Sequence, residues 1–227
     1  MCGRFALVAT GEEVAAHYQL AEVPFIAPRY NIAPTQPVAA VRLDHAGARQ
    51  LTHFQWGLIP SWSKDPSLGS KMINARAETA ADKPAFRAAF KRRRCLIPAS
   101  GFYEWQATDG RKQPMYIHPG GGHAAAGGLL SLAGLWEVWH APDGGELETC
   151  TILTTTPNTL MEPIHNRMPV ILDPADYGMW LDPTTAQDQL NHLLRPFAPE
   201  MLAAYPVSTA VNRPGNDTAD CIAPLAE

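Results

Sequence analysis

Four strand-like runs, separated by turn-rich connections, constrain the fold of this chain more than any other feature. The runs are rich in the aliphatic, β-branched and aromatic residues typical of strands, and the connections contain the Gly and Asp residues that favour turns. They predict an antiparallel sheet in the middle of the chain. The runs read CLIPASGFYEW (95–105), QPMYIHP (113–119), LSLAGLWEVWH (130–140) and ETCTILTTT (148–156), and a Gly-rich stretch, GGGHAAAGG (120–128), separates the second from the third.

A hairpin and several helices are predicted around this sheet. VAAVRL (38–43) and ARQLTHFQW (48–56) flank the turn DHAG and predict the hairpin. Thr10 and Glu13 form a capping-box pattern, which predicts a helix over 11–20. DKPAFRAAFKRRR (82–94) predicts a helix capped by Asp82, with three residues on its core face: Phe86, Ala89 and Phe90. Two Asp-Pro pairs predict helices over 174–181 and 184–194.

The remaining segments are expected to be irregular. Prolines 24, 28, 34 and 37 argue against regular structure over 24–37, and residues 57–82 read as a long irregular stretch. Helix, strands, helix, strands and helices follow one another, an order that favours an α+β fold over alternating βαβ units. Without repeats or an evident linker, the simplest expectation is a single domain over residues 1–227.

The composition indicates a soluble globular protein. The 227 residues are 46% hydrophobic, enough to bury a sizeable core without a stabilising metal or disulfide. The first 20 residues lack the apolar run of a signal peptide or membrane span, so we expect a cytoplasmic protein with no membrane partner. Four widely spaced cysteines predict reduced thiols rather than a zinc site or a disulfide framework, and no metal or cofactor is expected: Cys2, Cys95, Cys150 and Cys221.

The charge is uneven along the chain. The formal net charge is -4, but residues 71–94 hold eight Lys and Arg against two acidic residues, a local charge of +6. This segment could bind phosphates as a patch on an otherwise acidic protein. The alternative for KRRR (91–94) is a solvated helix end, where cations suit the helix dipole.

The chain begins MCGRF, so removal of Met1 exposes Cys2 as an N-terminal residue. An N-terminal Cys carries an amine and a thiol on adjacent carbons, with ordinary pKa values of about 8 and 8.5. Such a pair can react twice with one carbonyl. The alternative is that Cys2 is only a small residue that opens a strand.

Two titratable residues elsewhere are candidates for proton transfer. Glu104 lies in GFYEW among aromatic residues, which would raise its carboxyl pKa; strand alternation also allows an ordinary surface acid there. His165 lies in EPIHNRMPVIL before a buried-strand pattern, where an imidazole can exchange protons near neutral pH, or where it serves only as a structural histidine.

A third candidate is the stretch MINARAE, in which Asn74, Arg76 and Glu78 alternate. In an extended segment all three point the same way and could bind amine and phosphate groups, or form an internal ion-pair network.

The motifs GxGxxG, GxSxG, HExxH and the Walker loop are absent from the sequence.

Seven motifs, in order, resemble the SOS-response-associated peptidase (SRAP) family of abasic-site processing proteins. They span residues 1 to about 212: MCGRF, RYNIAPTQ, WGLIPSW, NARAET, GFYEW, IHNRMPVIL and VSTAVN. The resemblance implies a protein that recognises an abasic site in single-stranded DNA and joins itself to the ring-opened sugar. Cys2 would form an imine through its amine and close a thiazolidine ring through its thiol. With the patterns above, the expected fold is α+β, with a mainly antiparallel, barrel-like sheet core and a few flanking helices.

The resemblance also implies roles for individual residues. Asn74 would hold the N-terminal amine, Glu104 would act as acid and base near the imine, and His165 would help to open the deoxyribose ring. Ser63 stands where some members carry a second Trp, so base stacking there is expected to be weaker. The residues expected near DNA are Arg4, Asn31, Trp62, Arg76 and Thr154.

Further activities stay open at this point. The family name implies a peptidase. An imine at an abasic sugar can also lead to strand cleavage by a lyase reaction. Ordinary methionine trimming suffices to expose Cys2.

Two rival functions are an N-terminal-nucleophile cysteine peptidase or hydrolase that uses Cys2, His165 and Asn74, and a non-catalytic single-stranded DNA-binding module. A monomer is the expected oligomeric state.

Overall fold

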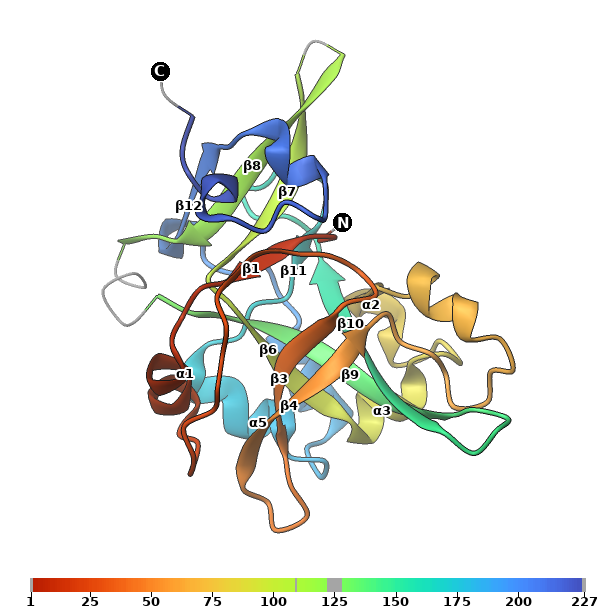
Figure 1. The fold of residues 1–227 in the computed structure, drawn as a ribbon. Coiled ribbons are helices and arrows are strands. Elements are labelled where there is room, and N and C mark those ends of the chain that lie inside the picture. Colours follow the sequence, from red (N-terminus) through yellow and green to blue (C-terminus); the bar gives the residue numbers. More distant parts are fainter. Residues whose placement is uncertain (1, 109, 122–127, 226–227) are drawn as a thin grey trace.

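The computed structural model of the protein describes residues 2–108, 110–121 and 128–225, and its strands form two sheets (Figure 1). One sheet has the order β12-β8-β7-β1-β2 and the other is built around β3, β4, β6, β9 and β10. The strands of the first are β1 (Phe5–Leu7), β2 (Arg29–Ile32), β7 (Gly101–Thr108), β8 (Arg111–Pro119) and β12 (Leu202–Pro206). In Figure 1 β7, β8 and β12 lie above the second sheet.

The second sheet closes into a barrel. β10 pairs with β4, β4 with β3, β3 with β6, β6 with β9, and β9 pairs back with β10. Two short strands, β5 and β11, pair with β10 as well. The bounds are β3 (Pro37–Leu43), β4 (Arg49–Trp56), β5 (Asn74–Arg76), β6 (Arg94–Ala99), β9 (Leu130–His140), β10 (Glu146–Thr155) and β11 (Met168–Pro169). The expected α+β fold with a barrel-like core is confirmed.

Short helices flank the sheets. The α-helices are α1 (Gly11–Tyr18), α2 (Ala77–Ala80), α3 (Arg87–Arg92), α5 (Tyr177–Leu181) and α6 (Gln187–Leu193). The 3-10 helices are η1 (Pro66–Lys71), η2 (Pro174–Asp176), η3 (Pro199–Met201), η4 (Thr209–Asn212) and η5 (Ala219–Cys221). The capping box of Thr10 and Glu13 is present, which explains why α1 begins at Gly11.

Several sequence predictions need correction. The proline-rich stretch 24–37 contains β2, because the pairing residues lie between the prolines. The stretch 57–82 contains η1, β5 and α2. The helix expected from Asp82 begins only at Arg87, although Ala89 and Phe90 are buried and Phe86 packs against the core, as expected. Most of the Gly-rich connection over 120–128 lies outside the described residues.

One predicted strand is in fact two. The run CLIPASGFYEW bends at Ser100, so that β6 belongs to the barrel and β7 to the first sheet. A Cβ atom at Gly101 would lie 2.4 Å from the ring of Tyr116, so only glycine fits there. This passage between the sheets carries Glu104 into the first sheet, opposite the N-terminal strand.

Candidate active site

Cys2 is held beside Glu104 by strand pairing. β1 and β7 are antiparallel with Phe5 opposite Phe102, and the backbone N–H of Tyr103 donates to the carbonyl of Arg4 (2.9 Å). The same register places the start of the chain alongside Glu104. Cys2 is fully buried and precedes β1, which begins at Phe5, so it does not open the strand.

The surroundings of Cys2 keep its thiol protonated. Burial raises the pKa of the Cys2 thiol well above its ordinary value, and the nearby Glu104 carboxylate raises it further. A hydrogen bond from the Arg4 backbone N–H acts in the opposite direction. Such a thiol reacts when a neighbouring base takes its proton, not as a free thiolate.

Glu104 is a buried acid, so its interpretation as a surface residue is wrong. It is 2% exposed, since the face of β7 opposite Tyr103 and Trp105 is covered. Burial raises the pKa of the Glu104 carboxyl, and the N-terminal amine and, when it is protonated, His165 partly offset this. A carboxyl with a raised pKa can give a proton to one group and take it back from another.

His165 faces Glu104 and can change tautomer in place. Its Nε2 lies 3.9 Å from Oε2 of Glu104. Its Nδ1 lies 3.0 Å from the backbone nitrogen of Arg167 and 3.2 Å from the carbonyl oxygen of the same residue. The backbone N–H of Arg167 can donate to Nδ1 when Nδ1 carries no proton, and the carbonyl can accept from Nδ1 when it carries one. Nε2 can therefore act as a proton donor or as an acceptor without movement of the ring.

Asn74 ties the N-terminal segment to the barrel. Its Nδ2 donates to the carbonyl of Cys2 (2.8 Å), and β5 is fixed by parallel pairing with β10. Its Oδ1 is buried and accepts no hydrogen bond from the residues that the structure describes. The structure thus brings four predicted site residues to one place, from four separate parts of the chain: Cys2, Asn74, Glu104 and His165.

The predicted network within MINARAE takes a different form. Residues 74–76 are extended, but Glu78 lies in α2 and pairs with Arg167 through both carboxylate oxygens (2.6 and 2.9 Å). Arg167 also donates to the carbonyl of Thr154, which is itself fully buried. The sequence analysis missed Arg167, although it lies only two residues after His165 in the same motif.

Arg4 and Asn31 form a buried cluster with the C-terminal segment. Nη1 of Arg4 donates to Oδ1 of Asn31 and to the carbonyl of Val211 (both 2.8 Å). Nδ2 of Asn31 lies within hydrogen-bonding distance of three carbonyls: Val211 (3.1 Å), Arg213 (3.1 Å) and Asn216 (2.6 Å). Asn31 is fully buried, so any influence on DNA acts through the residues that it holds.

Trp62 and Arg76 are exposed. The Trp62 side chain is 62% exposed in the loop after β4, whereas the neighbouring Ser63 is buried and bonds within that loop. Arg76 is exposed at the end of β5, opposite Thr154 in the register. Both side chains are free to meet a ligand, and their contact with DNA remains a prediction.

Known proteins resemble this chain over nearly all its length. The family model described as "SOS response associated peptidase (SRAP)" matches residues 1–214. The chain belongs to the SRAP family. "Abasic site processing protein YoqW" of Bacillus subtilis is 43% identical over 229 residues, covering 98% of this chain and 99% of the relative. "Abasic site processing protein HMCES" of Xenopus tropicalis is 36% identical, covering 87% of this chain and 66% of the relative.

A solved structure gives the same result for the fold. A crystal structure of a protein from Bacteroides thetaiotaomicron superposes with a TM-score of 0.86 at 28% identity, covering 99% of this SRAP chain and all of the other. Across the described ranges, no helix is long and apolar enough to cross a membrane. In the same ranges, no three His, Cys, Asp or Glu residues are grouped so as to hold a metal ion.

The basic segment 71–94 of this SRAP chain is not one phosphate patch. Arg94 is buried and donates to the backbone carbonyls of Phe90, Lys91, Trp180 and Asp182. Arg93 pairs with Glu137 (2.6 Å). The interpretation of KRRR as a helix end holds for Lys91 and Arg92, which occupy the last turn of α3.

Proposed function

We propose that this protein recognises abasic sites in single-stranded DNA and joins itself to them through Cys2 after removal of Met1. The observation that carries the proposal is the convergence on Cys2 of a buried acid, an amide and an imidazole that faces the acid. The names of its relatives support processing of abasic sites as the task.

The proposed reaction needs two bonds to one carbon. The amine of Cys2 condenses with the aldehyde of the ring-opened deoxyribose, forming an imine and releasing water. The sulfur then adds to the imine carbon while the thiol proton moves to the nitrogen, which closes a thiazolidine ring. No other reactant is required.

Each neighbouring group has a part that suits its geometry. Glu104, whose pKa is raised by burial, gives the proton that the departing water needs and then takes the thiol proton. His165 takes the proton of the sugar hydroxyl and returns it to the ring oxygen, which opens the ring. The buried Oδ1 of Asn74 can accept a hydrogen bond from the new N-terminal amine.

Three parts of the proposal add detail that membership of the SRAP family does not supply. Trp62 would stack on an exposed base and Arg76 would bind phosphate, which suits single-stranded DNA without sequence preference. A minor lyase reaction would arise when the imine eliminates before the ring closes. The protein would act as a monomer in the cytoplasm, on nucleoid DNA, and need no self-cleavage beyond loss of Met1.

The rival functions predict different products. A cysteine peptidase requires His165 to activate Cys2, yet the Nε2 atom of His165 faces Glu104 instead.

The test is to incubate the protein with a single-stranded oligonucleotide that contains one abasic site and to run a denaturing gel. A shifted band that disappears in Cys2→Ala supports the proposal. Absence of the band contradicts it, and a band retained in Cys2→Ala moves the link to another residue.

A further inference from the structure

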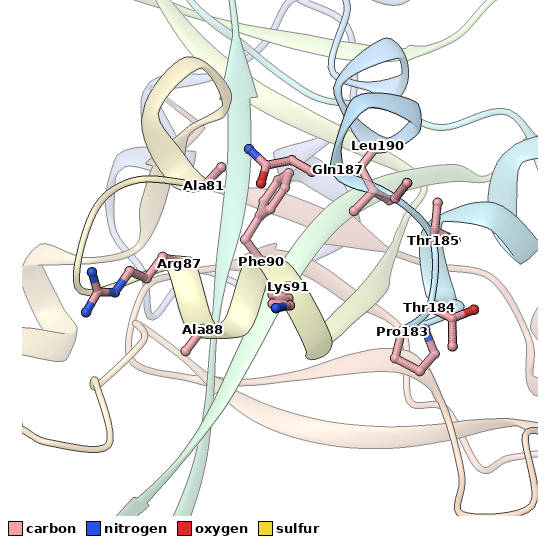
Figure 2. Close-up of a pocket in the computed structure, with 11 residues that line it drawn as sticks. Ala81, Arg87, Ala88, Phe90, Lys91, Pro183, Thr184, Thr185, Gln187 and Leu190 are labelled. Atoms are coloured by element: carbon pink, nitrogen blue, oxygen red, sulfur yellow. The ribbon is translucent and has the colours of Figure 1, made fainter.

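A groove separates α3 from the segment that leads into α6 (Figure 2). Its volume is about 570 Å³, within the range of ligand pockets, roughly 300–1,000 Å³. One wall is α3 and the other is the segment from Pro183 to Leu190, as Figure 2 shows. None of the residues proposed to act on the abasic site lines this groove.

The floor of the groove is apolar. Phe90 and Leu190 are buried and belong to the hydrophobic core, and Ala81 and Ala88 add small side chains from the α3 side. Pro183 closes one end. Small residues over a packed floor leave room for apolar side chains of a partner.

The rim of the groove is positive. Arg87 and Lys91 lie four residues apart on α3, so they share one side of the helix, and no acidic residue lines the groove. Within the described residues neither side chain takes part in an ion pair. Arg93, by contrast, is paired with Glu137.

The two cations lie at opposite ends of α3. Lys91 is in the last turn, where the helix dipole favours a cation. Arg87 is the first residue of the helix, and Figure 2 shows its guanidinium at the end of the groove far from Pro183 and Thr184. Both side chains are exposed and can reach carboxylates of a partner at the edge of the groove.

We propose that this groove binds an acidic segment of a partner protein, in which apolar side chains lie between carboxylates. The apolar side chains of the segment would contact the floor of the groove, and its carboxylates would pair with Arg87 and Lys91. Gln187 could form a hydrogen bond with the backbone of the segment. This inference does not depend on the chemistry at Cys2.

A nucleic acid fits the groove less well. The only aromatic side chain in its lining, Phe90, is 2% exposed and cannot stack on a base. The adjoining hollow, which shares Ala81 and Gln187 with the groove, is lined by Glu78 and Asp82. These acids repel any anion, so the carboxylates of the partner must lie on the Arg87 and Lys91 side of the groove.

The test uses a fluorescent peptide of about twelve residues in which Asp and Glu surround two Leu and two Phe residues. A matched peptide carries Asn and Gln in place of the acids. We expect saturable, salt-sensitive binding of the acidic peptide to the full chain, measured by anisotropy. Arg87→Glu with Lys91→Glu should weaken it by at least about tenfold, because two ion pairs become repulsions.

Arg92→Glu is the matched control, since Arg92 lies on the same helix, is exposed, and does not line the groove. It should change the affinity less than about twofold, as expected of a charge outside the contact. Ala88→Trp is a second variant, which fills the groove without altering charge and should also abolish binding. Circular dichroism verifies the fold of each variant.

Four results would overturn the proposal. These are no binding of the acidic peptide at millimolar concentration, equal binding of the neutral peptide, an equal loss in Arg92→Glu, and unchanged binding in Ala88→Trp. Displacement of the peptide by a single-stranded oligonucleotide, with amide NMR shifts at the groove residues, would instead identify a nucleic acid as the occupant.

Discussion

The amide nitrogen of Asn74 donates a 2.8 Å hydrogen bond to the carbonyl of Cys2, and this bond joins the N-terminal segment to β5. β5 is in turn fixed to β10 by parallel pairing, with Asn74 opposite Ile152. Cys2, the residue proposed to react, is thus held by a strand of the barrel. Ordered positioning of this kind lowers the entropic part of a reaction barrier.

Glu104→Gln should slow crosslinking by at least about a hundredfold, because an amide keeps the size of the side chain but cannot transfer a proton. The rate of adduct formation on abasic single-stranded DNA measures this effect. Glu148→Gln is the control, since Glu148 is a carboxylate on β10 whose partner is Arg42. Equal rates for wild type and Glu104→Gln would contradict the role of Glu104.

Glu104 should also make stability depend on pH. Burial raises the pKa of its carboxyl in the folded state, so the folded protein resists its ionisation. Protonated Glu104 makes its full contribution to the free energy of unfolding below the ordinary glutamate pKa. This contribution is lost as the pH rises through the higher pKa of the folded state. Glu104→Gln should therefore melt at a higher temperature than wild type at pH 8, with the gain vanishing near pH 4. A gain that grew toward low pH would contradict this sign.

Trp62→Ala should weaken binding of single-stranded DNA by about 1–3 kcal/mol, the usual contribution of one base stacked on an aromatic ring. The melting temperature should not change, because the side chain is 62% exposed. Phe25→Ala is the control, as Phe25 is 90% exposed in another loop. Fluorescence anisotropy with an undamaged oligonucleotide makes the comparison, and similar losses in both variants would count against a specific role for Trp62.

Asn31→Ala should lower the free energy of unfolding by about 2–4 kcal/mol, because it leaves the buried Arg4 and three carbonyls of the C-terminal segment with fewer partners. Urea denaturation measures the change. Asn191→Ala, at an exposed position of α6, should cost less than about 0.5 kcal/mol. A small effect of Asn31→Ala would show that the C-terminal segment is held by other contacts.

Local signals in the sequence predicted local structure well. The capping box of Thr10 and Glu13 and the turn at 44–47 act over a few residues, so α1 and the β3–β4 hairpin form where expected. The parallel pairing of β10 with β4 and β5 joins residues about a hundred and about eighty positions apart, and no short-range pattern encodes it. β2 was missed because prolines lie on both sides of it, although its four residues form a strand that pairs with β1.

The candidate site was predictable in residue type more than in environment. Alternation placed Glu104 on the face opposite Tyr103 and Trp105, but only the folded chain shows that this face is covered. The position of Asn31 near DNA stays a prediction, whereas its burial against carbonyls of the C-terminal segment, 180 positions away, could not be predicted from a local pattern. Arg167 was missed because its importance lies in a distant partner, Glu78.

The central claim is that the amine and the thiol of Cys2 both bond to one sugar carbon, and intact-mass spectrometry of the adduct tests it most directly. The account predicts the mass of the protein without Met1 plus that of the oligonucleotide, less one water, and no crosslink when Cys2 is replaced by Ala. An adduct that retains Met1, or one that forms equally well in Cys2→Ala, would contradict it.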